Sequence, residues 1–191
     1  MPEPMTVAAL HAHAKALSED EFRERFGDAF FMRGGGSASL RKPRVFQETS
    51  KGDASPALRA AEHGASPNPL KRRAGADVME FTIYFLRPND PKGRRVTVGR
   101  TGNNDVVIAD SSVSKFHAVI TRDAAGGVQV KDASSTTGTR INDELIPADE
   151  YRTLKGGEEV AFGEVHLTFL GVTSLHNFLK RVIPPPNPVS Q

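Results

Sequence analysis

Residues 81–85 read FTIYF, in which large apolar side chains alternate with side chains that carry a hydroxyl group. The same period of two recurs at residues 96–98 and 165–169. Successive side chains of a strand point to opposite faces of its sheet, so this period indicates strands with one buried face. Further short candidates, with turn-forming residues between them, lie at 105–108, 117–122, 127–132, 139–142 and 159–162. Their spacing predicts an all-β sandwich over residues 80–171.

A helical period precedes these strands. Residues 18–21 read SEDE, which has the S-x-x-E form of a capping box. Aromatic side chains then recur at the spacing of four that places them on one helical stripe, at Phe22, Phe26 and Phe30. We expect a helix at about 18–27 and another near 5–16, which together make a short helical arm of residues 1–33. So short a segment cannot bury a core of its own, so the arm must pack against another part of the chain or stay loose.

A second amphipathic pattern follows the strands, within residues 172–191. Apolar side chains recur there at helical spacing, at Leu175, Phe178, Leu179 and Val182. Ser174 is a candidate N-cap, and Pro184-Pro185-Pro186 cannot continue a helix. We therefore expect a C-terminal amphipathic helix that closes the sandwich and is followed by a proline-rich tail.

The composition changes between the arm and the strands. Residues 34–78 contain 6 Gly, 4 Pro and 5 Ser, and 8 of their apolar residues are alanines, which bury little area. This composition predicts a disordered linker. It carries 8 basic against 4 acidic residues, and we interpret these charges as solvated. Thr49, Ser50 and Ser55 carry hydroxyl groups within this segment and are candidate phosphorylation sites.

The overall composition excludes several classes of protein. The 191 residues include 25 Lys and Arg against 23 Asp and Glu, a net charge of +2, which argues against a nucleic-acid partner. The absence of cysteine excludes disulfides, thiolate metal sites and cysteine nucleophiles. The sequence has no run of 18 apolar residues and no signal-peptide pattern. We therefore expect a cytoplasmic protein without a membrane partner.

Three polar clusters fall between predicted strands: Gly99-Arg100, residues 114–117 (SKFH) and residues 134–139 (SSTTGT). The loops of a sandwich gather at its two ends, so clusters that are distant in sequence can share one surface. A guanidinium offers paired donors to a phosphate, hydroxyls add further donors, and amides in a Gly- and Ser-rich turn can surround an anion. The three clusters together favour a phosphate-binding site.

At these residues the sequence resembles the forkhead-associated (FHA) domain family. The family pattern is Gly-Arg, then Asn-Asp-apolar, then Ser-x-x-His, and finally Asp-x-x-Ser-Thr-Asn-Gly-Thr. The corresponding pieces here, in the same order, are Gly99-Arg100, Asn104-Asp105-Val106, SKFH at 114–117 and DASSTTGT at 132–139. The resemblance implies an eleven-stranded FHA-type β-sandwich that binds phosphothreonine peptides through loops at one end.

The resemblance also implies roles for individual residues. By position, Arg100, Ser114 and Thr136 hold the phosphate. Lys115 occupies a place where the family often has Asn. Thr137 stands where the family most often has an Asn that contacts the peptide main chain, and a hydroxyl is shorter than that amide and lacks its separate donor and acceptor.

Three further residues are implied to support this site rather than to contact the ligand. His117 ties the binding loops together by hydrogen bonds in the family. Gly99 and Gly138 permit turns that a side chain would block.

The expected function is that of an adaptor that binds phosphothreonine on a protein, with a Ser/Thr kinase or a kinase substrate as partner. The alternative is a phosphorylation-independent scaffold that uses the sandwich faces and the terminal helices, and Thr137 favours it. An enzyme is not expected, since Ser114 and His117 lack an orienting carboxylate and an oxyanion hole. His11 and His13 lack a third ligand and are interpreted as surface residues. We therefore expect neither a metal nor a cofactor.

Overall fold

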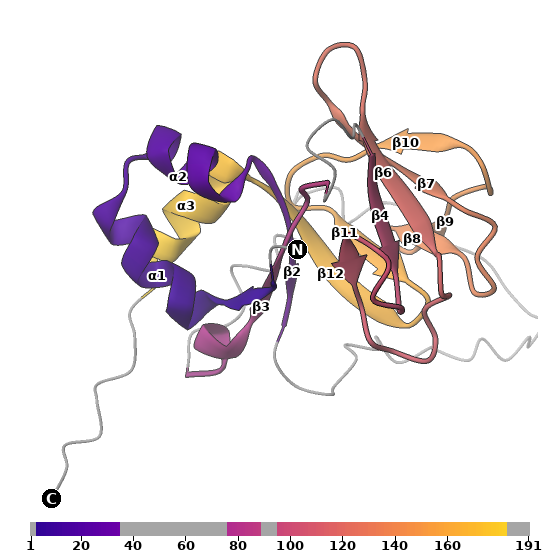
Figure 1. Ribbon diagram of the computed structural model, residues 1–191, viewed down its shortest axis with the longest axis horizontal. Coiled ribbons are helices and arrows are strands. Elements are labelled where there is room, and N and C mark those ends of the chain that lie inside the picture. The colour runs from indigo at the N-terminus through magenta and orange to yellow at the C-terminus, as the bar shows by residue number, and fades with distance from the viewer. Residues whose placement is uncertain (1–2, 35–75, 89–94, 183–191) are drawn as a thin grey trace, which may run out of the picture.

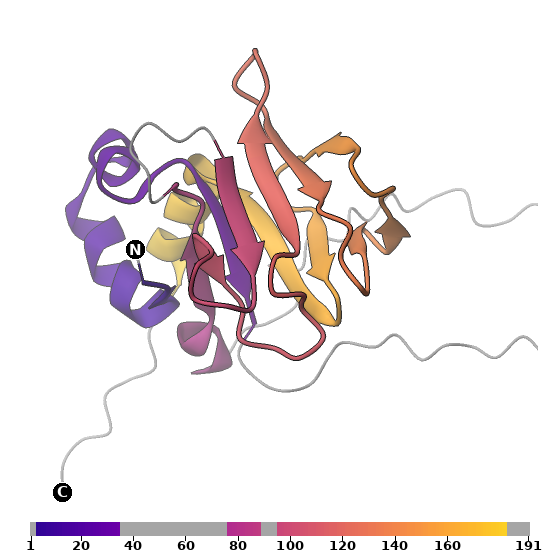
Figure 2. The same ribbon diagram turned by 45° about the vertical axis from the view of Figure 1, so that its right-hand side comes forward.

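The computed structural model describes residues 3–34, 76–88 and 95–182. They form two β-sheets and three α-helices, which stack in three layers (Figure 1). The helices pack on one face of a seven-stranded sheet, and a five-stranded sheet packs on its other face, as the turned view in Figure 2 also shows. The expected sandwich of two sheets is therefore present and carries an additional helical layer. No helix in the described part of the chain is long and apolar enough to cross a membrane.

The five-stranded sheet consists of β4 (Arg95–Gly99), β5 (Val106–Val107), β6 (Ala118–Arg122), β7 (Val128–Asp132) and β10 (Tyr151–Thr153). Their order is β10-β7-β6-β4-β5, and only the β4–β5 pair is parallel. Along β7, buried residues alternate with half-buried ones, as expected for a strand with one face in the core.

The seven-stranded sheet consists of β1 (Met5–Thr6), β2 (Ala29–Arg33), β3 (Thr82–Phe85), β8 (Thr139–Ile141), β9 (Glu144–Leu145), β11 (Glu159–Phe162) and β12 (Val165–Gly171). Their order is β1-β3-β2-β12-β11-β8-β9, and all pairs are antiparallel. The sheet thus combines strands from both ends of the chain with strands from its middle.

Two apolar cores lie on the two faces of this sheet. The inner core, between the sheets, includes Phe31, whose ring packs edge-on against Phe162 and Phe169 at centroid distances of 5.5 and 6.0 Å. The outer core, under the helices, includes Phe30 and Phe22, whose ring centroids are 6.3 Å apart. The neighbouring residues Phe30 and Phe31 serve different cores because successive side chains of β2 point to opposite faces.

The helical layer consists of α1 (Val7–Ala16), α2 (Glu19–Phe26) and α3 (Val172–Arg181), and a 3₁₀-helix (Ala76–Glu80) precedes β3. The capping box predicted at the start of α2 is present. The Glu21 amide donates to Ser18 Oγ at 3.4 Å, and the Ser18 amide donates to the Glu21 carboxylate at 2.8 Å. These bonds satisfy amides that a helix start otherwise leaves without partners.

The predicted helical arm over residues 1–33 contains both expected helices, but its last residues form a strand instead. Phe30 belongs to strand β2, which pairs with β3 on one side and with β12 on the other. Because β2 is buried on both faces, its sequence AFFM has no period of two. The spacing of four between Phe26 and Phe30 suggested one helix, but the helix ends at Phe26 and Phe30 lies in the strand. The boundary expected at residue 33 therefore does not separate the arm from the sandwich in space.

Two other expectations differ in detail. Helix α3 starts directly after β12 with Gly171 as its N-cap, so Ser174 lies inside the helix and does not cap it. The described residues form twelve strands, of which β1, β5 and β9 are two residues long, against the expected eleven. Most of the predicted linker over 34–78, with Thr49, Ser50 and Ser55, and the proline run lie outside the described residues.

Candidate functional site

Three loops meet at one end of the sandwich. The first loop (100–105) follows β4, the second (108–117) precedes β6, and the third (133–138) connects β7 to β8. The β6–β7 hairpin turn projects from the opposite end, at the top of Figures 1 and 2. The amide of Arg100 in the first loop donates to the Ser114 carbonyl in the second at 3.0 Å. The buried Asn104 side chain adds a bond to the Lys115 carbonyl at 2.7 Å. Residues that are distant in sequence are thus adjacent in space.

A pair of hydroxyl groups joins the second loop to the third. The Thr136 amide donates to Ser114 Oγ at 3.0 Å, and the Ser114 hydroxyl donates to Thr136 Oγ1 at 3.3 Å. Ser114 is half-buried and Thr136 is exposed. Two of the predicted phosphate ligands therefore contact each other at the surface.

The two predicted cations lie on the first and second loops. Arg100 and Lys115 are exposed, and within the described residues neither charged group has a hydrogen-bond or ion-pair partner. By contrast, Arg33, Arg122 and Arg152 each lie beside a carboxylate. An unpaired exposed cation keeps its N–H donors available to an anion.

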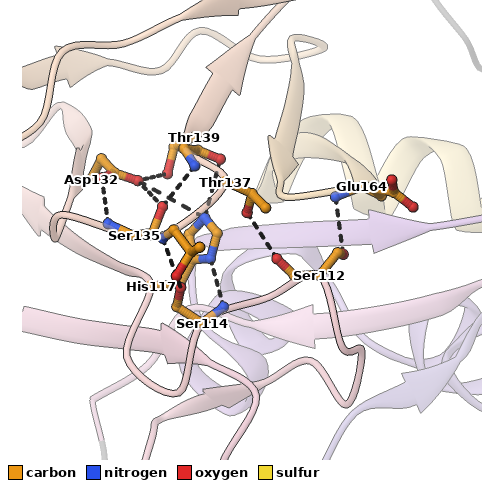
Figure 3. Close-up of polar contacts among 10 residues, drawn as sticks. Ser112, Ser114, His117, Asp132, Ser135, Thr137, Thr139 and Glu164 are labelled. Atoms are coloured by element: carbon orange, nitrogen blue, oxygen red, sulfur yellow. Dashed lines mark hydrogen bonds and ion pairs between the residues drawn. The ribbon is translucent and has the colours of Figure 1, made fainter.

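Thr137 forms its hydrogen bond within the protein. Its hydroxyl donates to the Ser112 carbonyl oxygen at 2.8 Å (Figure 3). Ser112 in turn donates from its hydroxyl to Asp110 at 2.7 Å and accepts a bond from the Glu164 amide at 3.0 Å. The hydroxyl and amide of Ser112, with a smaller contribution from the charge of Arg33, hold the pKa of Asp110 below its usual value.

His117 is fully buried and bridges the second and third loops (Figure 3). The Ser114 amide donates to its Nδ1 at 3.0 Å, so the ring proton is assigned to Nε2, which donates to the Gly138 carbonyl at 3.3 Å. Burial lowers the pKa of His117 and outweighs the opposing effects of the Gly138 carbonyl and the Asp132 carboxylate. The neutral ring is therefore a tie between loops, out of reach of a ligand.

A buried carboxylate shapes the third loop from inside. Asp132 Oδ1 accepts from the hydroxyls of Ser135 and Thr139, each at 2.7 Å, and Oδ2 accepts from the Ser135 amide at 2.9 Å (Figure 3). Burial acts to raise the pKa of Asp132, but these bonds outweigh it and hold the pKa below its usual value. The loop that carries Thr136 and Thr137 is thus fixed at its base.

The two glycines serve the site in different ways. Gly138 has a φ of +78°, and a Cβ there would lie 2.5 Å from a methyl carbon of Leu145. At Gly99 a Cβ would collide with the Lys115 carbonyl and the Asn104 side chain. Gly138 therefore permits a turn, as the resemblance implies, whereas Gly99 permits the close approach of two loops.

Sequence reasoning missed Asp110 and Ser112. Ser112 acts on Thr137 through a main-chain carbonyl, which no pattern of residue types reveals. A weak local signal was present, because Asp110 accepts from the amide two residues ahead at 3.0 Å, which is the Asx-turn that aspartate favours.

The histidines of the N-terminal segment differ from expectation at one position. His11 is buried, not at the surface, and its Nδ1 bonds to the Leu179 carbonyl at 2.7 Å. His13 packs against Phe26 with ring centroids 5.3 Å apart. In the described ranges, no three His, Asp or Glu residues are grouped so that they could hold a metal ion.

Several known proteins resemble part of this chain. The ABC transporter ATP-binding/permease protein Rv1747 of Mycobacterium tuberculosis is 30% identical over 112 residues, 55% of this chain and 12% of that protein. The probable serine/threonine-protein kinase fhkA of Dictyostelium discoideum is 32% identical over 96 residues, 44% of this chain and 16% of the kinase. The chain thus spans only a small part of the length of these curated relatives.

Among solved structures, Mycobacterium tuberculosis EmbR in complex with a low-affinity phosphopeptide is 27% identical. The match covers 46% of this chain and 21% of EmbR, with a TM-score of 0.39. The family model that matches this sequence is described as the FHA domain, and it covers residues 96–163. All three loops lie inside that range, so the part of the chain that carries them matches the FHA domain family model.

Proposed function

We propose that this chain is an adaptor whose FHA domain binds phosphothreonine on a partner protein through the three converging loops. The FHA resemblance supplies the ligand class. The observation that carries the proposal is the surface junction of Ser114 and Thr136, with Arg100 on the first loop and Lys115 on the second. Neither cation has a partner among the described residues. A phosphate dianion needs both charge and directed donors, and this junction has both.

Each residue has a distinct task in this proposal. Arg100 supplies paired N–H donors, and Lys115 supplies a second positive charge. The Ser114 hydroxyl turns its hydrogen from Thr136 Oγ1 to a phosphate oxygen, while the Thr136 amide continues to donate to Ser114 Oγ. The Thr136 hydroxyl then donates to a second phosphate oxygen, and Thr137 completes the surface beside it.

The proposed partner is a Ser/Thr kinase or the substrate of one, because such a kinase produces the phosphothreonine that is read. Recognition of this kind breaks no covalent bond, so the proposal includes no catalytic residue and no cofactor. The partner is a protein, and neither a nucleic acid nor a membrane takes part.

A second candidate function is a scaffold that binds an unphosphorylated partner through the sheet faces and the terminal helices. The observation that favours it is Thr137, which replaces the usual Asn and whose hydroxyl already donates to Ser112 at 2.8 Å. The Thr137 hydroxyl therefore has no hydrogen left to donate to a peptide, unlike the amide of an Asn.

Calorimetric titration of the full chain separates the two functions. One library of peptides is synthesised in three forms, with phosphothreonine, with phosphoserine and with unmodified threonine at the central position. We expect binding to phosphothreonine peptides, weakened by added inorganic phosphate, and little binding to the unmodified set. Equal affinity for the phosphorylated and unmodified forms would reject phosphate recognition and leave the scaffold.

A further inference from the structure

The Thr137–Ser112 bond differs from the other hydroxyl contact between the second and third loops. The Ser114–Thr136 contact uses the two hydroxyls that are proposed to bind phosphate, so ligand binding must rearrange it. The Thr137 hydroxyl instead donates to a main-chain carbonyl at 2.8 Å. This bond can remain intact while a phosphate occupies the site.

The acceptor of this bond is held in place from several sides. Asp110 accepts from the Ser112 amide at 3.0 Å and from its hydroxyl at 2.7 Å. The Glu164 amide donates to the same hydroxyl at 3.0 Å, and Gly163 lies so close to the Ser112 carbonyl that a Cβ there would collide with it. Arg33, at the end of β2, lies 3.9 Å from the Asp110 carboxylate. Thr137 therefore donates to a carbonyl oxygen, that of Ser112, whose position is fixed by its surroundings.

The chemistry of a hydroxyl limits what else Thr137 can do. A hydroxyl has one hydrogen, and in Thr137 it is donated to Ser112, so none is left for a peptide carbonyl. Only the lone pairs of Oγ1 remain, and these can accept from a peptide N–H. An Asn amide at the same place has two N–H donors and a carbonyl, and could hold the loop and a peptide at once.

We infer that Thr137 is a positioning residue, whose hydroxyl fastens the third loop to Ser112 and holds the phosphate-binding loops at their working separation. This inference rests on the proposed function and refines the role of Thr137 within it. A loop that is already held in its bound arrangement loses less conformational freedom when a ligand binds. The Thr137 hydroxyl thus contributes to affinity without touching the peptide.

Three variants of the full chain test this role by calorimetry with the best phosphothreonine peptide. Thr137→Val removes the donor and keeps the shape, and we expect it to weaken binding by about twofold to tenfold, the range of one net hydrogen bond. Thr137→Ser keeps the donor and should restore affinity to within about twofold. Thr173→Val is the matched control, because it deletes a hydroxyl that donates to Glu19 at 2.7 Å in the helical layer, and should leave binding unchanged. Unchanged binding by Thr137→Val would overturn the inference.

A modified peptide separates positioning from direct contact. The amide that follows the phosphothreonine is N-methylated, which deletes the donor that Oγ1 could accept from. If Thr137 only positions the loop, Thr137→Val weakens the parent and N-methylated peptides by the same factor. A difference of more than about threefold between the two factors would show contact with the peptide and contradict the inference.

Amide hydrogen exchange of the free protein tests the loop tie without any ligand. In Thr137→Val we expect faster exchange at Ser114 and Thr136 than in Thr173→Val, since one bond between their loops is lost. Equal rates in the two variants would overturn the inference even if phosphopeptides bind. Failure of the parent protein to prefer phosphorylated peptides would instead reject the proposed function, and exchange alone would then decide whether Thr137 ties the loops.

Discussion

The loop end of the sandwich and the helical layer hold distant chain segments together by opposite means. At the loop end, buried polar side chains such as His117 and Asp132 bond to the loops from inside. In the helical layer, aromatic rings from distant segments pack against one another, with the Phe26 and Phe85 centroids 5.8 Å apart. Buried apolar area is the main source of stability, whereas directed polar groups give recognition. We therefore expect the helical layer to contribute mainly stability, and the loop end to carry the proposed binding.

The largest expected effect is the loss of an aromatic ring from the helical layer. Phe22 is fully buried and packs against Phe26, Phe30 and His176. We expect Phe22→Ala to lower the free energy of unfolding by about 3–5 kcal/mol, because the lost transfer energy adds to the energy of the cavity. Urea denaturation followed by circular dichroism measures the change.

Phe116→Ala is the matched control, since Phe116 lies in the second loop with 47% of its surface exposed. The same deletion there should cost less than about 1 kcal/mol, because little apolar area returns to water. Similar losses of unfolding free energy in the two variants would contradict the view that the helical layer contributes more stability than the loop end.

The next largest effect is expected for Arg100→Ala, which should weaken binding without lowering stability. We expect Arg100→Ala to weaken phosphopeptide binding by about 2–5 kcal/mol, the range for removing one partner of a desolvated charge pair, which is about thirtyfold or more in affinity. Its stability should change by less than about 0.5 kcal/mol, because the exposed guanidinium has no partner within the described residues. Arg95→Ala removes an exposed arginine from the other end of β4 and should bind normally. Retained binding by Arg100→Ala would reject its assignment to the phosphate.

The smallest expected effect is a loss of folding stability at acid pH. Burial lowers the pKa of His117 below its ordinary value of 6.5, so the unfolded chain takes up a proton there at a higher pH than the folded protein does. Stability is therefore fully present above about pH 6.5 and falls as pH decreases toward the folded pKa, by at most about 1.4 kcal/mol per pH unit. Urea midpoints at pH 7.5, 6.5 and 5.5 measure this loss. His117→Gln should show a shallower dependence, and an identical slope would exclude His117 as its source.

The sequence was most informative where apolar side chains alternate with side chains that carry a polar group. Alternation located β3, β4 and β12 to within a few residues. It failed for β2, because four consecutive side chains of this strand are apolar and buried, so neither face is marked by a polar group. It also missed β9 and β10, which are exposed and only two and three residues long, too short for a period to be recognised.

The candidate site was located in sequence by motifs, and its contacts were visible only in space. The positions of the predicted strands placed Arg100, Ser114 and Thr136 on loops, and the family resemblance implied a common ligand for them. The bond from Thr137 to Ser112 depends on a carbonyl oxygen, and every residue has one, so residue types carry no trace of it. The buried position of His11 likewise depends on the packing of α1 against α3.

The insertion of β2 between β3 and β12 has a practical consequence for anyone who trims this protein. A fragment limited to residues 80–171 retains both neighbours and loses the strand that joins them. Its β12 would then present a row of unsatisfied amides and carbonyls beside a bared Phe169, which is a template for aggregation. Added as a separate peptide, residues 3–34 would supply the missing strand. We expect the fragment to be more soluble with this peptide than without it.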